Sequence, residues 1–207
     1  IFDCIVTTLN KRNCAEVDYV AQVGHEYDAN RVVYHNYVPV GRAEEHLELA
    51  PTPQQYEVVL NRIYDLMQEY KGKLGINVYC PFFARIAKER GMPNFDYWFN
   101  NVFLGQCFIG GRYIGLLENG DSRPCGFNEG YRMGNIKDKS MKEIWTDMQT
   151  SELTRKLRDR RNLKGKCGVC QYREICGGCR TRAEIYTGDL FASDPACGYV
   201  PKILRTQ

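Results

Sequence analysis

The sequence predicts an α/β fold in which a short parallel sheet is followed by a small, loop-rich region. Two observations lead to this prediction. Up to about residue 100, apolar and β-branched runs alternate with helical segments, which is the pattern of βαβ units. In the remainder, seven of the ten cysteines crowd together among many glycines. We therefore expect two domains, covering residues 1–100 and 101–207.

The first strand and the first helix are expected near the N-terminus. Residues 2–9 form an apolar and β-branched run that is typical of a strand. Asn13 and Glu16 are spaced to cap a helix that continues to about Val23, and Gly24 is expected to end it.

Two further strands, residues 31–40 and 75–80, flank a second helix. Thr52 can cap this helix, Pro53 suits its first turn, and Gln55 can complete a capping box. One stripe along the helix is apolar and is expected in the core: Tyr56, Val59, Leu60, Ile63, Met67 and Tyr70. Three strands leave a sheet edge uncovered, which indicates that the chain is part of something larger.

Beyond residue 100 the elements become short. Asn119–Gly120 is a favoured pair for a tight β-hairpin turn. Ser140 and Glu143 form a capping box for a short helix, and a basic helix is expected over residues 151–161. The stretch that follows has little hydrophobic mass, so metal clusters would be needed to stabilise it.

Composition and charge exclude several classes of protein. Hydrophobic residues make up 43% of the chain and charged residues 26%, as in a soluble globular protein. The net charge of +3 is too small to indicate a nucleic-acid partner, and no apolar run approaches the ~20 residues of a membrane span or marks a signal peptide. We therefore expect a cytoplasmic protein without membrane or nucleic-acid partners. In that reducing compartment, ten cysteines indicate metal or redox chemistry.

The strongest motif consists of two Cys-x2-Cys pairs, Cys167 with Cys170 and Cys176 with Cys179. Thiolates at this spacing can converge on one metal centre, and thiolate ligands favour zinc or iron–sulfur clusters. A single structural zinc ion would leave three cysteines of the same region unexplained, namely Cys107, Cys125 and Cys197. The residues therefore favour two iron–sulfur clusters, with a zinc-stabilised binding domain as the alternative.

The order of these cysteines resembles the SPASM domain, the twin-cluster extension of many radical S-adenosylmethionine (SAM) enzymes. The resemblance covers about residues 100–200 and includes Gly120-x4-Cys125, Cys176-Gly177-Gly178-Cys179-Arg180 and Asp194-Pro195-x-Cys197. It implies two auxiliary [4Fe–4S] clusters. Carried over by position, the ligands of one would be Cys167, Cys170, Cys176 and Cys197.

The same resemblance assigns three cysteines, Cys107, Cys125 and Cys179, to the other auxiliary cluster. Its fourth iron would be open or bound by a residue that the motif does not identify. Cys80 is a candidate by elimination, although a buried core cysteine is the favoured interpretation.

The first half is similar to the later strands of a radical SAM partial barrel, through Thr7-Thr8-x-Asn10-Lys11-x-Asn13 and Val38-Pro39-Val40-Gly41-Arg42. The resemblance implies the C-terminal portion of a partial (β/α) TIM-type barrel, followed by a small iron–sulfur domain with a β-hairpin and short helices. The Cys-x3-Cys-x2-Cys motif that binds the catalytic cluster and SAM is absent from these residues. We expect SAM and a third [4Fe–4S] cluster only in a full-length enzyme, with the missing strands upstream of Ile1, and we expect this chain alone to be inactive.

These motifs look most like members that oxidatively decarboxylate or remove porphyrin side chains in haem and haem d1 biosynthesis. In such an enzyme the auxiliary clusters relay electrons or bind substrate, and a ferredoxin or flavodoxin is the expected electron donor. Four arginines could pair with substrate carboxylates: Arg42, Arg112, Arg180 and Arg182.

Two alternatives to the porphyrin enzyme stay open. One is a maturase of peptides or of other enzymes, although Gly126 after Cys125 argues against sulfatase maturation. The other is a stand-alone electron-transfer module, which the barrel-like first half disfavours.

Overall fold

The computed structural model describes residues 3–101, 105 and 107–205, so Phe2 of the expected first strand lies outside them. Three parallel strands form the first sheet in the order β1 (Cys4–Thr8), β2 (Arg31–His35) and β3 (Gly75–Tyr79). Thr8 lies opposite His35, and His35 lies opposite Tyr79, so all three strands end at one edge. The predicted parallel arrangement is confirmed.

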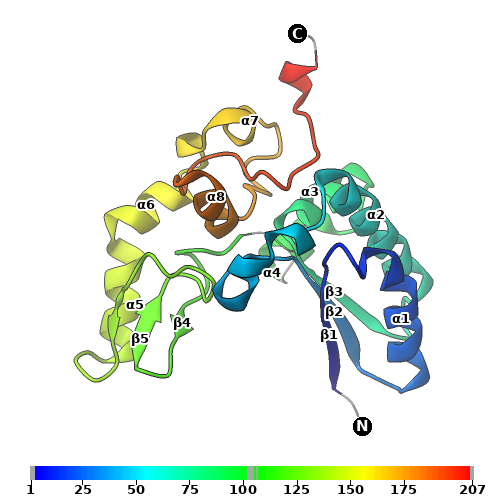
Figure 1. The fold of residues 1–207 in the computed structure, drawn as a ribbon, viewed down its shortest axis with the longest axis horizontal. Helices are drawn as coiled ribbons and strands as arrows, with labels where there is room; N and C mark the ends of the chain where they lie inside the picture. The colour runs from blue at the N-terminus through cyan, green and yellow to red at the C-terminus, as the bar shows by residue number, and fades with distance from the viewer. Residues whose placement is uncertain (1–2, 102–104, 106, 206–207) are drawn as a thin grey trace.

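The main hydrophobic core lies between this sheet and two helices, α1 (Val17–Glu26) and α2 (Pro53–Glu69), which Figure 1 shows on the same side of the sheet. Alternate strand residues enter this core, including Val32 and Tyr34 from β2 and Val78 from β3. The apolar stripe predicted along α2 is buried or partly buried in the same core.

The opposite face of the sheet is partly uncovered. Val6 on β1 is 62% exposed. At the end of the strands the rings of His35 and Tyr79 stack with their centroids 4.8 Å apart, and the ring of Phe127 meets His35 edge-on. This face of the sheet therefore meets the second half of the chain at the carboxyl ends of its strands.

Two expectations for the first helix are wrong. Gly24 does not end the helix but lies inside α1, which continues to Glu26. A Cβ atom on Gly24 would lie 2.5 Å from Cγ2 of Val32, so glycine is needed here to let the helix approach β2 closely. Asn13 does not cap the helix; its side chain closes the preceding turn, and a 3₁₀ segment, Cys14–Glu16, precedes α1.

The capping box that opens α2 is confirmed, because Thr52 and Gln55 each bond the backbone N–H of the other. The strand expected over residues 31–40 is shorter and is followed by a 3₁₀ segment, Gly41–Leu49. Two helices that we did not predict continue the first half, α3 (Pro81–Glu89) and α4 (Phe95–Asn101). Seven of the nine residues of α3, from Pro81 to Ala87, are buried.

The second half contains a small antiparallel sheet and short helices. The predicted hairpin is confirmed: β4 (Gly115–Leu116) pairs with β5 (Asp121–Arg123), and Gly120 in the turn has a φ of +90°. A third strand, β6 (Gly134–Asn135), pairs with β5. The helices are α5 (Met141–Thr150), α6 (Glu152–Arg158), α7 (Gly165–Gly168) and α8 (Arg180–Thr187), with 3₁₀ segments at Arg160–Asn162 and Lys202–Leu204.

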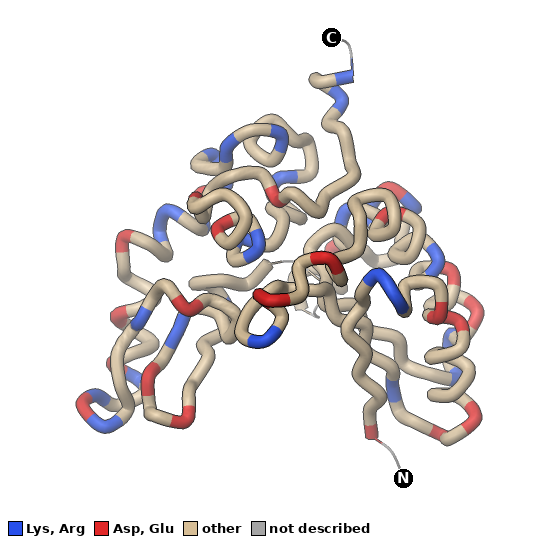
Figure 2. Tube along the Cα trace, viewed as in Figure 1, with Lys and Arg blue, Asp and Glu red and all other residues tan. Residues whose placement is uncertain are grey.

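The predicted capping box of Ser140 and Glu143 opens α5. The basic helix expected over residues 151–161 is present as α6, which is shorter and is followed by the 3₁₀ segment. Acidic and basic side chains are interspersed along both halves of the chain (Figure 2). Among the residues that the structure describes, no helix has the length and apolar character to cross a membrane.

Replacing Gly24 by alanine should lower the free energy of unfolding by about 1–2 kcal/mol, because the clash with Val32 outweighs the better helix propensity of alanine. Urea denaturation followed by circular dichroism measures this. Gln22→Ala, at an exposed position on the same helix, is the control and should change the free energy by less than about 0.5 kcal/mol. A gain in stability from Gly24→Ala would contradict the close-approach explanation.

Candidate metal centre

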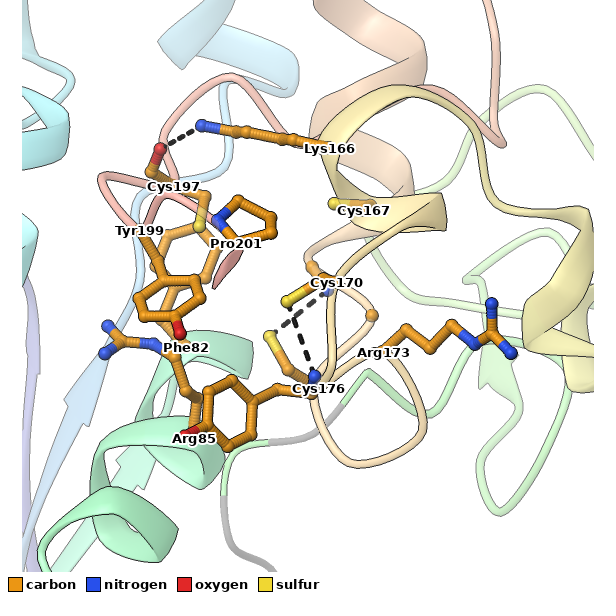
Figure 3. Close-up of a pocket in the computed structure, with 13 residues that line it drawn as sticks. Phe82, Arg85, Lys166, Cys167, Cys170, Arg173, Cys176, Cys197, Tyr199 and Pro201 are labelled. Carbon is orange, nitrogen blue, oxygen red and sulfur yellow. Dashed lines mark hydrogen bonds between the residues drawn. The ribbon is translucent and has the colours of Figure 1, made fainter. Parts of the chain in front are cut away.

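Four cysteines line one pocket between the second half of the chain and α3. Cys167 lies in α7, Cys170 and Cys176 lie in the loop between α7 and α8, and Cys197 lies in the C-terminal segment. Figure 3 shows their sulfur atoms pointing towards a common space. Phe82 and Arg85 of α3 complete part of the wall, together with Tyr199. Residues that are far apart in the sequence therefore bring four thiols together.

The backbone around these thiols is arranged to donate hydrogen bonds to sulfur. The N–H of Tyr172 donates to Sγ of Cys170 at 3.4 Å, and the N–H of Gly178 donates to Sγ of Cys176 at 3.4 Å. Gly177 and Gly178 have φ values of +66° and +67°, a conformation that glycine adopts without strain. Such N–H donors favour thiolate ligands, so the donor set and its surroundings fit an iron–sulfur cluster.

The remaining three cysteines of the region, Cys107, Cys125 and Cys179, form a second group. The thiol of Cys107 interacts electrostatically with those of Cys125 and Cys179. Cys179 is the N-cap of α8, and its sulfur accepts a hydrogen bond from the N–H of Arg182 at 3.5 Å. Cys107 and Cys125 pack against a small second core, which consists of Ile109, Leu157 and Leu190.

Burial makes several of these thiols weak acids. It raises the pKa of Cys197 to about 11 and the pKa of Cys179 to about 12, and it raises the pKa of Cys176 well above the ordinary value. Binding to a metal requires the thiolate, so the metal must displace these protons. Within the described residues, no three His, Cys, Asp or Glu side chains are placed to hold a single metal ion.

Cys80 belongs to the main core of the first half. It is fully buried in the main core, and burial raises its pKa to about 12. Its ionisable neighbours are Arg182, Asp194 and Cys197. This position fits the interpretation of Cys80 as a core residue.

A buried ion pair holds the two halves of the chain together beside the cysteines. The guanidinium of Arg182 donates to both carboxylate oxygens of Asp194 at 2.8 and 2.7 Å, and to the carbonyl of Tyr37 at 2.9 Å. It also lies over the rings of Tyr56 and Phe82. Burial opposes ionisation of Asp194, but the charge and hydrogen bonds of Arg182 outweigh it and hold the pKa of Asp194 below the ordinary value.

The carboxylate of Asp194 also accepts a hydrogen bond from the N–H of Cys179 at 2.7 Å, so the ion pair positions a cysteine of the second group. We did not predict this role for Asp194. The only sequence signal is its place three residues before Cys197 in Asp194-Pro195-x-Cys197.

The four arginines proposed as partners of substrate carboxylates fall into two pairs. Arg180 and Arg182 are buried, and their guanidinium groups bind protein carbonyls or Asp194, which makes them structural in this fold. Arg42 and Arg112 are exposed. Arg112 lies over the ring of Phe108 and lines the same hollow as Cys107, whereas Arg42 lies in the 3₁₀ segment after β2.

Comparison with known proteins identifies the cysteine region. Residues 107–180 match the SPASM family, an iron–sulfur cluster-binding domain. The chain is 35% identical to an AdoMet-dependent heme synthase of Methanosarcina barkeri, over 95% of this chain and 56% of that protein. It is 28% identical to an Fe-coproporphyrin III synthase of the same organism, over 92% of this chain and 51% of that protein. The chain thus spans about half the length of these curated relatives.

The fold is similar to that of Streptococcus suis SuiB in its crystal structure with the precursor peptide SuiA. The TM-score is 0.63 at 16% identity, and the match covers 95% of this chain and 44% of SuiB. This likeness confirms the predicted α/β fold class, the C-terminal portion of a partial (β/α) barrel followed by a small domain with a hairpin and short helices.

Replacing Asp194 by alanine should lower the free energy of unfolding by about 3–5 kcal/mol, because Arg182 is left buried without its partner. Chemical denaturation of the purified chain measures this. The pKa of Asp194 is lowered in the folded state, so the contribution is complete above the unfolded value of about 4 and is lost as the pH falls through the folded value.

The control is Arg161→Ala, which breaks the pair with Asp159 at an exposed position where Arg161 is 78% accessible. This change should cost at most about 1 kcal/mol. Similar losses for both variants would contradict a special role for the buried pair.

Proposed function

Because residues 107–180 are a SPASM iron–sulfur cluster-binding domain, and the chain has the fold of the C-terminal part of a radical SAM enzyme, we propose that it holds two auxiliary [4Fe–4S] clusters for such an enzyme. The observation that carries this proposal is the convergence of four thiols on one pocket, with N–H donors aimed at two of the sulfurs.

In this proposal each group of cysteines binds one cluster. Cys167, Cys170, Cys176 and Cys197 supply four ligands to the first. Cys107, Cys125 and Cys179 supply three ligands to the second, which leaves one iron for another ligand. The proximity of the thiols supports this division, because the thiol of Cys107 interacts electrostatically with those of Cys125 and Cys179.

We place the domain boundary near residue 100, although the two parts are in close contact. The side chains of Ile175, Cys176, Ala196 and Cys197 pack against the core of the first half. Gly198 lies so close to Pro53 that a Cβ atom would be 2.8 Å from the Pro53 carbonyl oxygen. The four-cysteine pocket therefore includes a wall from the barrel part.

The auxiliary clusters, when bound, supply one-electron redox chemistry and, at an open iron, a site for a ligand. The residues that would hold the clusters lie beside α3, which follows β3, and beside Phe127, which meets His35 at the end of β2. The carboxyl ends of the strands are also where α/β barrels place their active sites. The motif for the catalytic cluster is absent from the 207 residues, so this chain by itself should not cleave SAM.

We propose a porphyrin as the substrate class, with haem biosynthesis as its setting. The names of the relatives support this, and so does the edge of the sheet nearest the three-cysteine group. There the stacked rings of His35 and Tyr79 face Phe127, two residues after Cys125. Burial lowers the pKa of His35, which favours the neutral form of its ring.

A peptide maturase is the second candidate function. The observation in its favour is the match to SuiB, which is bound to a precursor peptide in its crystal structure. In either case a ferredoxin or flavodoxin is the electron donor that we expect.

Anaerobic reconstitution with iron and sulfide should give about eight irons per chain. Cys170→Ala should remove about four of them and Cys125→Ala about four others, because each variant lacks a ligand of a different cluster. Iron and sulfide analysis with absorption spectra measures this.

Cys4→Ala and Cys80→Ala are the controls and should keep both clusters. A colourless chain with stoichiometric zinc would favour the zinc-stabilised domain instead. A Cys170→Ala/Cys125→Ala double variant that still holds about four irons would contradict the division into two groups, because both cysteines would then bind the same cluster.

Iron coproporphyrin should bind the reconstituted chain, and His35→Ala should weaken this binding about tenfold, the equivalent of about 1.4 kcal/mol. The reason is the loss of a ring from the proposed substrate face. Absorbance titration of the Soret band measures it. His25→Ala, on α1 beside Tyr70, is the control and should leave binding unchanged. Binding of precursor peptides but not of the porphyrin would favour the maturase.

A further inference from the structure

Arg160 occupies the space between the two groups of cysteines. It begins the 3₁₀ segment that precedes the first Cys-x2-Cys pair. Its Nη2 donates to the carbonyl of Cys107 at 3.2 Å. Its guanidinium lies against the Cys176–Cys179 turn, where a Cβ atom on Gly177 would be 2.8 Å from Nη1. A positive charge thus touches the backbone of both groups.

The other terminal nitrogen of this guanidinium has no hydrogen-bond partner in the part of the chain that the structure describes. Nη1 of Arg160 is buried, and among the described residues it makes no hydrogen bond. No ion pair of the described residues involves Arg160 either, so no carboxylate neutralises its charge. A buried donor without an acceptor destabilises the folded state, and native proteins rarely contain such an unpaired group.

The neighbouring arginine indicates what the missing acceptor is. Arg180, which is fully buried, donates from Nη1 to the carbonyls of Leu190 and Ala192 and from Nη2 to Sγ of Cys167 at 3.9 Å. A guanidinium of this region therefore already donates to a cysteine sulfur. The acceptors that the proposed clusters add beside Arg160 are also sulfur atoms.

We propose that Arg160 donates from Nη1 to a sulfur of the cluster held by Cys107, Cys125 and Cys179, and that its charge raises the reduction potential of this cluster. The inference rests on the proposed function, since it needs the cluster to be bound. Reduction adds a negative charge to the cluster, and a nearby cation whose Nη1 is shielded from solvent stabilises that state. Arg160 would then be a positioning residue, and this cluster would be easier to reduce with the arginine than without it.

The test uses the reconstituted chain and a potentiometric titration followed by electron paramagnetic resonance. Arg160→Gln should shift the midpoint potential of one cluster to a more negative value and leave that of the other unchanged. In the Cys170→Ala background, where only the three-cysteine cluster is expected, the same negative shift should appear. Arg160→Lys keeps the positive charge but lacks the planar guanidinium. The midpoint potential of the affected cluster in this variant should therefore lie between those of the wild type and Arg160→Gln.

Arg158→Gln is the matched control, because Arg158 lines the same hollow as Arg160 but is exposed to solvent, which screens its charge. It should leave both potentials unchanged. If Arg160→Gln loads poorly, the lysine variant with full iron content decides the question. Unchanged potentials in Arg160→Gln and Arg160→Lys, or an equal shift in Arg158→Gln, would overturn the inference while leaving the two-cluster proposal intact. A chain that binds no clusters would overturn the proposed function itself.

Discussion

The buried ion pair between Arg182 and Asp194 is the contact on which the cysteine region depends. Asp194 holds the N–H of Cys179, while Arg182 reaches the carbonyl of Tyr37 and lies between aromatic rings of the first half. One pair therefore sets the positions of α8, the segment before Cys197 and the barrel part relative to one another. Neither partner can be lost alone, because the other would remain as an uncompensated buried charge.

The turn from Cys176 to Cys179 joins the two groups of cysteines. Cys176 faces the four-cysteine pocket and Cys179 belongs to the other group, with only Gly177 and Gly178 between them. Both glycines have positive φ values, and a Cβ atom on either would meet a guanidinium, that of Arg160 or of Arg180, at 2.8 Å. The geometry of one group is thus tied to that of the other through a turn that only glycine fits.

The cysteine region is also tied to the sheet. Arg85 of α3 binds Glu57 of α2 and lies over Tyr199, which lines the four-cysteine pocket. At the strand ends, His35 meets Phe127 beside Cys125. The barrel part thus contacts both cysteine groups. The second half has only a small hydrophobic core, so these contacts help to fix its position relative to the sheet.

The sequence alone determined the parts of this protein whose signals are local. The capping boxes at Thr52 and Ser140, the hairpin at Gly120 and the parallel strands follow from spacing and turn chemistry, and the cysteine order was enough to indicate the kind of metal centre. The tertiary structure decided what depends on distant partners. Gly24 lies inside its helix because β2 packs against it, and Arg182 is buried because Tyr37, 145 residues earlier, and Asp194 surround it. Local patterns carry no record of such contacts, since burial of a glycine or an arginine is set by the elements packed around it.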